Sequence, residues 1–273
     1  MKGSDFIKAL RSGQHVFGTL IVSTAPKWPG VVATLGLDFI FIDTEHIALD
    51  RSQVSQMCNI YQNLGLAPVV RIPSPDPYEA CMALDGGAAG IIAPYVETPE
   101  QVRQLVGAVK YKPLKGERLQ HLLKYNKGPE PELTKYLSEN NSGNALIVNI
   151  ESVPAMDALN EILAIEELDG ILIGPHDLSC SLGIPEQYNN QRFLDAVDVI
   201  IKKARSKNKG AGIHVTYPSG YKSEIEWARK GANLIVHGGD IIAFQHSTQN
   251  EIKEIKKALN DKSGNSAVKN TNI

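Results

Sequence analysis

Eight short apolar runs, separated by segments with helical periodicity, restrict the fold of this chain more than any other feature. The runs are almost continuously apolar and lack clean alternation, as expected of parallel strands covered on both faces. They are Val16–Val22, Asp38–Ile42, Pro68–Ile72, Gly90–Ala93, Ala145–Ile150, Gly170–Ile173, Ala211–Val215 and Asn233–Val236. Eight strands that alternate with helices predict an α/β protein of the (β/α)8 (TIM) barrel type.

Helix-start signals support this alternation. Thr98 precedes a predicted helix over Pro99–Lys110, and Ser152 precedes another over Pro154–Ile165. Ser or Thr followed by Pro is typical of a capped helix start. A doubly wound sheet would have fewer strands and usually a Gly-rich turn after the first one. Here the first strand runs instead into Ser23-Thr24-Ala25-Pro26.

The length of 273 residues suits one barrel, which typically takes about 250. A single barrel domain is therefore predicted over residues 1–259, followed by a polar, aperiodic and disordered tail over residues 260–273. The segment 111–144 is too long for an ordinary connection, and only Arg118–Tyr125 has helical character. We expect it to form a lid or a subunit contact.

Charge and cysteine content restrict the partners. The net charge of −2, without a long basic run, gives no reason to expect nucleic acid or an anionic membrane surface. Met1–Arg11 is mixed and polar, unlike a signal peptide, and no apolar stretch approaches the roughly 20 residues that span a bilayer. Cys58, Cys81 and Cys180 lack metal-type spacing, so neither a disulfide framework nor a zinc site is expected. A cytoplasmic protein with a small-molecule partner is predicted.

Charged side chains stand where three of the strands would stop. Arg71 ends one run, Glu151 follows another, and Asp177 comes shortly after a third. In a (β/α)8 barrel the carboxyl ends of the strands form the active face, so the three groups should meet there. Two carboxylates and a guanidinium suit a divalent metal that holds a small oxo acid. The alternatives are a structural ion pair at Arg71 and helix caps at the two acidic residues.

Five motifs together resemble the HpcH/HpaI aldolase family over about Val16 to Leu259. They are Ile42-Asp43-Thr44-Glu45-His46, Val69-Val70-Arg71, Pro94-Tyr95-Val96-Glu97-Thr98, Asn149-Ile150-Glu151 and Gly170-Ile171-Leu172-Ile173-Gly174-Pro175-His176-Asp177-Leu178-Ser179. The resemblance implies a metal-dependent barrel that cleaves 4-hydroxy-2-oxo acids, including 2-keto-3-deoxy sugar acids, into pyruvate and an aldehyde.

The resemblance also implies roles for individual residues. Glu151 and Asp177 would bind the divalent ion, for which Mg²⁺, Mn²⁺ and Co²⁺ are candidates. Arg71 would contact the oxo group of the substrate, and His46, oriented by Asp43, would serve as acid and base. The backbone of Gly174, Pro175, His176 and Asp177 would receive the substrate carboxylate. Without the resemblance, Asp43 and His46 could also be a polar pair that ends a strand and caps the next helix.

Several positions depart from the family pattern. Many members carry Gln where this chain has Asn149, and a small residue where it has His176. Arg118 keeps the arginine of a loop that should shape the mouth, but not the glycine that usually follows it. These residues are predicted to contact the substrate or to shift its contacts. His214 ends one strand and His237 follows another, so both should face the active end.

Three functions remain open at this point. The first is a class II pyruvate aldolase, because none of the eight candidate strands contains the lysine that a Schiff-base aldolase needs. The second is a citrate-synthase-like enzyme of siderophore biosynthesis that condenses oxaloacetate with acetyl-coenzyme A on the same barrel. The third is an oxo-acid-binding barrel without catalysis. The resemblance further implies a homo-oligomer, usually a hexamer, whose last helix, Ile241–Leu259, packs on a neighbour.

Overall fold

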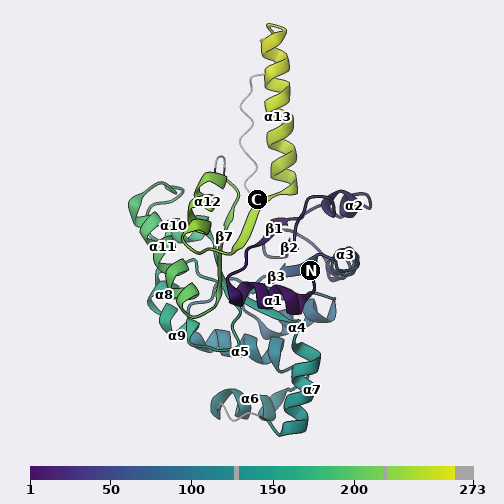
Figure 1. Cartoon of the computed structure of the whole chain (residues 1–273), viewed down its shortest axis with the longest axis vertical. Helices are drawn as coiled ribbons and strands as arrows, with labels where there is room; N and C mark the ends of the chain where they lie inside the picture. The colour runs from purple at the N-terminus through teal and green to yellow at the C-terminus, as the bar shows by residue number, and fades with distance from the viewer. Residues whose placement is uncertain (126–128, 218–219, 262–273) are drawn as a thin grey trace.

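The fold is a closed barrel of eight parallel strands, seen in a computed structural model that describes residues 1–125, 129–217 and 220–261 (Figure 1). The strands are β1 (Val16–Leu20), β2 (Phe39–Asp43), β3 (Ala67–Arg71), β4 (Gly90–Ala93), β5 (Ala145–Asn149), β6 (Gly170–Ile173), β7 (Gly210–Val215) and β8 (Leu234–Gly239). Each strand pairs with the next one in sequence, and β8 closes the barrel on β1. The predicted (β/α)8 barrel is therefore confirmed.

Helices precede, separate and follow the strands along the chain. They are α1 (Gly3–Ser12), α2 (Trp28–Val32), α3 (Arg51–Asn63), α4 (Pro77–Asp85), α5 (Pro99–Lys110), α6 (Gly116–Tyr125), α7 (Pro131–Asn141), α8 (Val153–Asp157), α9 (Leu159–Leu163), α10 (Pro175–Ser181), α11 (Gln191–Ser206), α12 (Tyr221–Arg229) and α13 (Asp240–Ala258). Thr98 and Gln101 form a reciprocal cap at the start of α5. The helix predicted over Pro154–Ile165 is instead two short helices that meet at Ala158.

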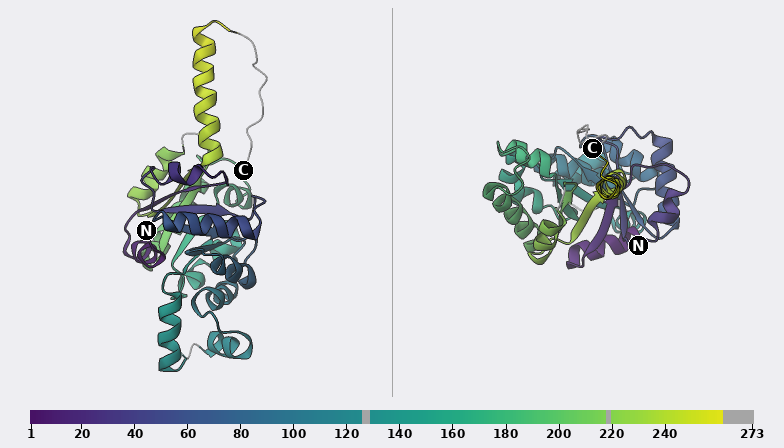
Figure 2. Two further views of the ribbon diagram at one scale, coloured as in Figure 1. Left: turned by 90° about the vertical axis from the view of Figure 1, so that its right-hand side faces the viewer. Right: turned by 90° about the horizontal axis from the view of Figure 1, so that it is seen from above.

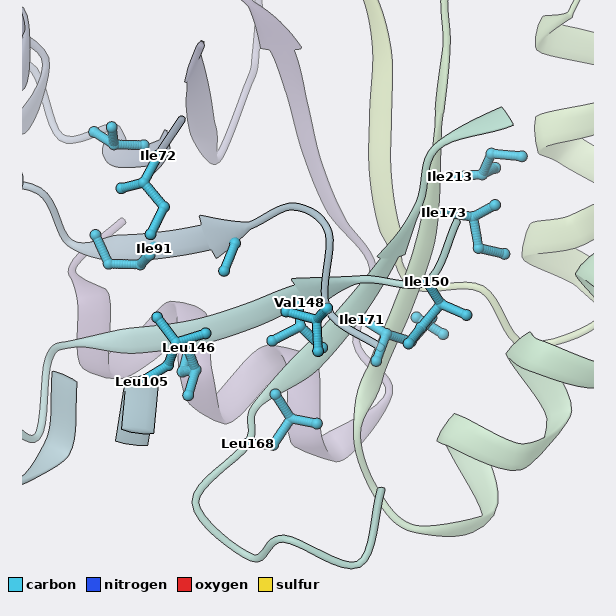
Figure 3. Packing of buried hydrophobic residues seen from close by; sticks show 14 of the residues in the cluster. Ile72, Ile91, Leu105, Leu146, Val148, Ile150, Leu168, Ile171, Ile173 and Ile213 are labelled. Atoms are coloured by element: carbon cyan, nitrogen blue, oxygen red, sulfur yellow. The ribbon is translucent and has the colours of Figure 1, made fainter. Parts of the chain in front are cut away.

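Apolar side chains fill the barrel on both sides of its wall. Inside, a cluster around Phe39, Phe41 and Ile147 is closed at the amino end by Phe6 and Leu10 of α1. Outside, branched side chains from the opposite faces of the strands pack beneath the helices (Figure 3). Strands such as β2, β4, β5 and β6 are covered on both faces and therefore read as continuous apolar runs, whereas β1 and β8 each leave a side chain exposed, at Phe17 and His237.

The segment 111–144 differs from the expectation. It forms two helices, α6 and α7, rather than one short helical stretch, and they lie at the opposite end of the molecule from α13 (Figure 1). A connection from a helix to the next strand enters the barrel at its amino end, whereas substrates bind at the carboxyl end. The expectation of a lid over this chain's own mouth, with Arg118 on it, is therefore wrong. Arg118 lies on α6, where it forms an exposed ion pair with Glu130.

Helix α13 projects away from the barrel rather than lying against it (Figures 1 and 2). Asp240, at its root, is buried, while Ile241, Phe244, Ile252 and Ile255 are exposed. Across the described ranges, no helix has both the length and the apolar character needed to cross a bilayer. Residues 262–273, which belong to the predicted tail, lie outside the described residues.

Candidate active site

The carboxyl ends of the strands bring polar side chains together at the barrel mouth. Asp43 and Arg71 are the last residues of β2 and β3 and stand opposite each other in the strand register. Asn149 ends β5, Glu151 follows it by two residues, and Asp177 lies in the first turn of α10, just after β6. These five residues were predicted from sequence to form the site, and the fold places all of them at the same end of the barrel.

Arg71 is held by two carboxylates. Its Nε and Nη2 donate to the two oxygens of Asp43 at 2.8 and 2.6 Å. Glu45 Oε2 lies 3.1 Å from Nε as a second anionic neighbour. Burial disfavours the charged guanidinium, but the bonds and charge of Asp43, followed by Glu45 and Glu151, raise the pKa of Arg71. Such a bidentate pair fixes the plane of the guanidinium. Among the described residues, none accepts a hydrogen bond from Nη1, which leaves that nitrogen available to a ligand.

Asp43 does not orient His46 as the sequence led us to expect. Its carboxylate accepts the two bonds from Arg71 and the Glu45 backbone N–H at 2.9 Å. Burial, the largest single effect, opposes its ionisation, yet the bonds and charge of Arg71 together with the Glu45 N–H bond lower the pKa of Asp43. The carboxylate beside the half-exposed His46 ring is that of Glu45, with Oε1 3.5 Å from Nε2.

Two residues of the mouth were named in the sequence motifs but given no function. Glu45 is almost fully buried and lies between Arg71 and His46. Tyr95 has a left-handed backbone with φ 55°, and its pKa is raised to about 12, first by a hydrogen bond with Glu45. A non-glycine residue in this region is strained and marks a position that its surroundings hold in place. No spacing rule in the sequence distinguishes these two residues from ordinary loop residues.

Glu151 is oriented by two donors. The Tyr95 backbone N–H reaches Oε1 at 2.8 Å, and Asn149 Nδ2 reaches Oε2 at 2.9 Å. Burial, opposed by these donors and reinforced by the charge of Asp177, raises the pKa of Glu151. Ser152 caps α8, because its hydroxyl accepts a hydrogen bond from the Ala155 N–H. Glu151 is therefore not the cap of this helix.

Glu151 and Asp177 converge at Gly174. A Cβ added to this glycine would lie 2.6 Å from Glu151 Oε2 and 3.5 Å from Asp177 Oδ2. Two carboxylates that share one small space repel each other unless a cation lies between them. Asn149 Oδ1 is also buried and receives no hydrogen bond from a described residue. In the described part of the chain no group of three or more His, Cys, Asp or Glu side chains is arranged for a metal. The oxygen donors of Glu151 and Asp177 nevertheless suit a divalent ion that takes its remaining ligands from substrate and water.

The other predicted residues lie at the edge of the site. His176 is exposed on α10, with Nδ1 3.9 Å from the Glu186 carboxylate. Pro175 is the first residue of α10 and has no N–H, so among the backbone groups expected to receive a carboxylate only those of Gly174, His176 and Asp177 can donate. The fold does not bring Arg118 to this end of the barrel.

Two histidines stand near the carboxyl ends of β7 and β8. His214 is half-buried inside the barrel, and its Nε2 lies 3.0 Å from the Gly238 carbonyl oxygen. His237 Nδ1 lies 2.6 Å from a carboxylate oxygen of the buried Glu224 on α12. Both were expected to face the active end from their positions in the sequence, but their partners were not predicted.

Comparisons with known proteins identify the family of the chain. Residues 17–247 match the HpcH/HpaI aldolase/citrate lyase family. The 2-keto-3-deoxy-L-rhamnonate aldolase of Escherichia coli K12 is 30% identical over 263 residues, which cover 94% of this chain and 95% of that protein.

Solved structures give the same result. The HpcH/HpaI aldolase from Desulfitobacterium hafniense DCB-2 is 28% identical, with a TM-score of 0.77 over 91% of this chain and 95% of that chain. Citrate synthase SbnG is 26% identical, also with a TM-score of 0.77, over 93% of this chain and 98% of that chain. The expected enzyme class, a lyase of the aldolase type, is confirmed by these relatives. The chain belongs to the HpcH/HpaI aldolase/citrate lyase family.

Proposed function

We propose that this chain is a divalent-metal-dependent class II aldolase that cleaves or forms 4-hydroxy-2-oxo acids through the enolate of pyruvate. The observation that carries the proposal is the convergence of Glu151 and Asp177 at Gly174, close enough to Arg71 for the charge of Glu151 to raise the pKa of Arg71. This arrangement offers two anionic ligands for a metal and a cationic donor for an oxygen that becomes negatively charged during the reaction.

The metal-binding role falls to Glu151 and Asp177. A bound Mg²⁺, Mn²⁺ or Co²⁺ would supply Lewis-acid polarisation of the substrate ketone. Arg71 donates from its free Nη1 to the ketone oxygen, and this bond strengthens as charge develops there. The two hydrogen bonds to Asp43 keep the Arg71 guanidinium in place, so this side chain needs little reorganisation during the reaction.

The remaining residues orient the substrate and move its proton. During cleavage His46 removes the proton of the C4 hydroxyl, the C3–C4 bond breaks to release the aldehyde, and the enolate takes up a proton at C3 to become pyruvate. Condensation runs through the same transfers in reverse. Glu45, whose Oε1 lies 3.5 Å from His46 Nε2, positions the ring for this transfer. The N–H groups of His176 and Asp177, at the start of α10, receive the substrate carboxylate. Asn149 keeps Glu151 in position through the bond at 2.9 Å.

The 2-keto-3-deoxy-L-rhamnonate aldolase relative supports a sugar-derived 2-oxo acid as the substrate. The similarity to citrate synthase SbnG over 93% of this chain keeps condensation of oxaloacetate with acetyl-coenzyme A as the second candidate. Both reactions use an enolate and an oxo acid, so the residues around Arg71 do not distinguish them. The aldolase is favoured because the aldolase relative matches the chain at the higher sequence identity.

We propose that copies of this chain assemble by exchanging α13, so that the α13 helix of one copy packs on the barrel of another. In a (β/α)8 barrel the eighth helix covers the outside of the wall, but here α13 projects away from it (Figure 2). A groove of about 510 Å³ between α2 and α12 lies beside its root, and Trp28, Val31, Leu35 and Tyr221 are among the residues that line it. The exposed apolar residues of α13 from a second copy suit this groove.

Light scattering tests the exchange. Ile252→Asp combined with Ile255→Asp should reduce the particle to a monomer, because both side chains are exposed apolar residues of α13. Asn250→Asp adds a charge to the opposite side of the same helix, since successive residues are about 100° apart around its axis. This matched control should keep the wild-type particle size. An assembly of unchanged size in the double variant would contradict the exchange.

Proton NMR of pyruvate in heavy water tests the chemistry, because exchange of the methyl protons reports enolate formation without knowledge of the aldehyde. Chelator-stripped protein should be inactive, and added Mg²⁺ should start the exchange. Asp177→Ala should abolish it. If no exchange occurs with Mg²⁺, Mn²⁺ or Co²⁺, the aldolase proposal is wrong. Citrate formation from oxaloacetate and acetyl-coenzyme A would then establish the second candidate.

A further inference from the structure

His214 occupies a position next to the proposed catalytic groups that the mechanism above does not use. Its ring meets the Phe41 ring edge to face, with centroids 5.2 Å apart and an interplanar angle of 89°. The Arg71 guanidinium carbon lies 5.3 Å from the centroid of the same ring. His214 and Arg71 therefore share one aromatic neighbour inside the barrel, directly above the apolar interior.

The hydrogen bond to Gly238 determines which nitrogen of His214 carries the proton. A carbonyl oxygen can only accept, so the contact of 3.0 Å requires the hydrogen to be on Nε2. Burial is the largest effect and, with a smaller contribution from the charge of Arg71, lowers the pKa of His214 to about 4, although the Gly238 bond raises it. The ring is therefore neutral near pH 7, and Nδ1 carries a lone pair. No described residue donates a hydrogen bond to Nδ1.

The chemistry of the substrate limits what this lone pair can bind. The pyruvate part of a 4-hydroxy-2-oxo acid offers only acceptors, namely its carboxylate and its ketone oxygen. The proton of the C4 hydroxyl goes to His46 in the proposed mechanism. The donors that remain are hydroxyl groups beyond C4, and these come from the aldehyde half of the substrate.

We propose that His214 is a specificity-determining residue that accepts a hydrogen bond at Nδ1 from a hydroxyl group of the aldehyde-derived half of the substrate. The proposal rests on the aldolase function above and narrows its substrates to hydroxylated aldehydes. The residue is half-buried near the carboxyl end of β7, and Phe41 and Gly238 fix the orientation of its ring. A site with a fixed acceptor discriminates against an analogue that lacks the donor, because the acceptor is then left unpaired.

Three aldehydes of similar size separate this role from simple packing. Glycolaldehyde carries the donor, acetaldehyde lacks the hydroxyl group, and methoxyacetaldehyde keeps the oxygen but not its hydrogen. We would measure kcat/KM for addition of pyruvate to each, in the presence of Mg²⁺. His214→Leu should lower the value for glycolaldehyde roughly tenfold, about the effect of one lost hydrogen bond, and leave the other two within about twofold. His214→Asn, which keeps an oxygen near the position of Nδ1, should restore part of the preference.

Equal effects of His214→Leu on all three aldehydes, or no effect on any, would overturn the proposal in favour of a packing role. Exchange of the pyruvate methyl protons should persist in His214→Leu, which separates a failure of this inference from a failure of the aldolase function. A second readout does not require turnover. In nitrogen-15 spectra of the imidazole, glycolaldehyde should shift the Nδ1 resonance of His214 more than acetaldehyde does. Equal shifts would contradict the proposal even in a protein without aldolase activity.

Discussion

The two ends of the barrel both bury carboxylates beside cationic side chains, but they satisfy them differently. At the amino end, Asp169 is fully buried and accepts bonds from Arg11 at 2.9 Å, Lys110 at 2.5 Å and the Leu146 N–H at 2.9 Å. At the carboxyl end, the buried atoms Glu45 Oε2 and Asn149 Oδ1 receive no hydrogen bond from a described residue.

This difference separates a structural network from a binding site. A buried carboxylate with all its acceptor sites used holds chain segments together and has nothing left for a ligand. A buried acceptor without a donor, such as Asn149 Oδ1, together with two carboxylates that converge on one glycine, costs free energy until a ligand or cation arrives. The amino end should therefore govern stability, and the carboxyl end should govern activity.

Removal of the Asp169 carboxylate should give the largest change in stability. Asp169→Ala leaves the Arg11 and Lys110 charges and the Leu146 N–H without this partner, so we expect a loss of about 3–5 kcal/mol. Urea unfolding would measure it. Glu151→Gln is the matched change at the mouth and should cost little, because it also removes repulsion with Asp177. Equal losses in the two variants would contradict the comparison.

An arginine-to-lysine substitution can be made at each end of the barrel, and only the one at the carboxyl end should lower activity. Arg71→Lys removes the two-point contact with Asp43 and the free Nη1, so exchange of the pyruvate methyl protons should fall about 10²-fold or more. Arg11→Lys, at the amino end, should leave the exchange rate within about twofold. A similar loss in both variants would mean that the amino end also supports catalysis.

Lys209 should give the amino end its own pH dependence. Burial, followed by the charge of Arg11, lowers the pKa of this lysine to about 8, below its ordinary 10.5. Between these values the unfolded chain binds more protons than the folded one, so stability should rise with pH. Between pH 7.5 and 10 the free energy of unfolding of the wild type should rise by about 1 kcal/mol more than that of Lys209→Met, allowing for partial screening by solvent. Parallel stability curves would contradict this assignment.

The smallest effect is expected from His237 at the mouth. Its bond to Glu224, the main cause, raises the pKa of His237 above the ordinary 6.5. A raised pKa contributes stability below pH 6.5 that is lost as the pH rises through the folded value. The His237 side chain is 61% exposed, so solvent screens the interaction. The free energy of unfolding of the wild type should exceed that of His237→Gln by less than about 1 kcal/mol at pH 6. The difference should be smaller still at pH 9. Thermal unfolding at the two pH values measures the difference.

The sequence predicted the barrel well because strands such as β2, β4, β5 and β6 are buried on both faces and read as single apolar runs. Arg71, Glu151 and Asp177 could be placed together because parallel strands end at the same face. The partner of Asp43 could not be predicted, since it depends on the register that sets Asp43 opposite Arg71. Arg118 was misplaced because sequence distance does not show at which end of the barrel a connection lies.

The role of Asp169 was also invisible in the sequence. Asp169 and Asp177 each stand at one end of the same strand, β6, but only the three-dimensional arrangement supplies the first with Arg11 and Lys110. His214 belongs to the same class, because the spacing placed it at a strand end while its contact with Gly238 depends on the pairing of β7 with the neighbouring strand β8.

The pairing of β1 with β8 sets the order in which a newly made chain can be completed. The Val22 N–H and the Asp240 carboxylate that receives it are 218 residues apart. A ribosome that adds 5–20 residues per second needs on the order of 10 to 45 s to make that stretch. Throughout this time the free edge of β1 has no final partner and offers unpaired backbone groups to other chains. Synthesis rate and chaperone access during these seconds should therefore influence the yield of native protein.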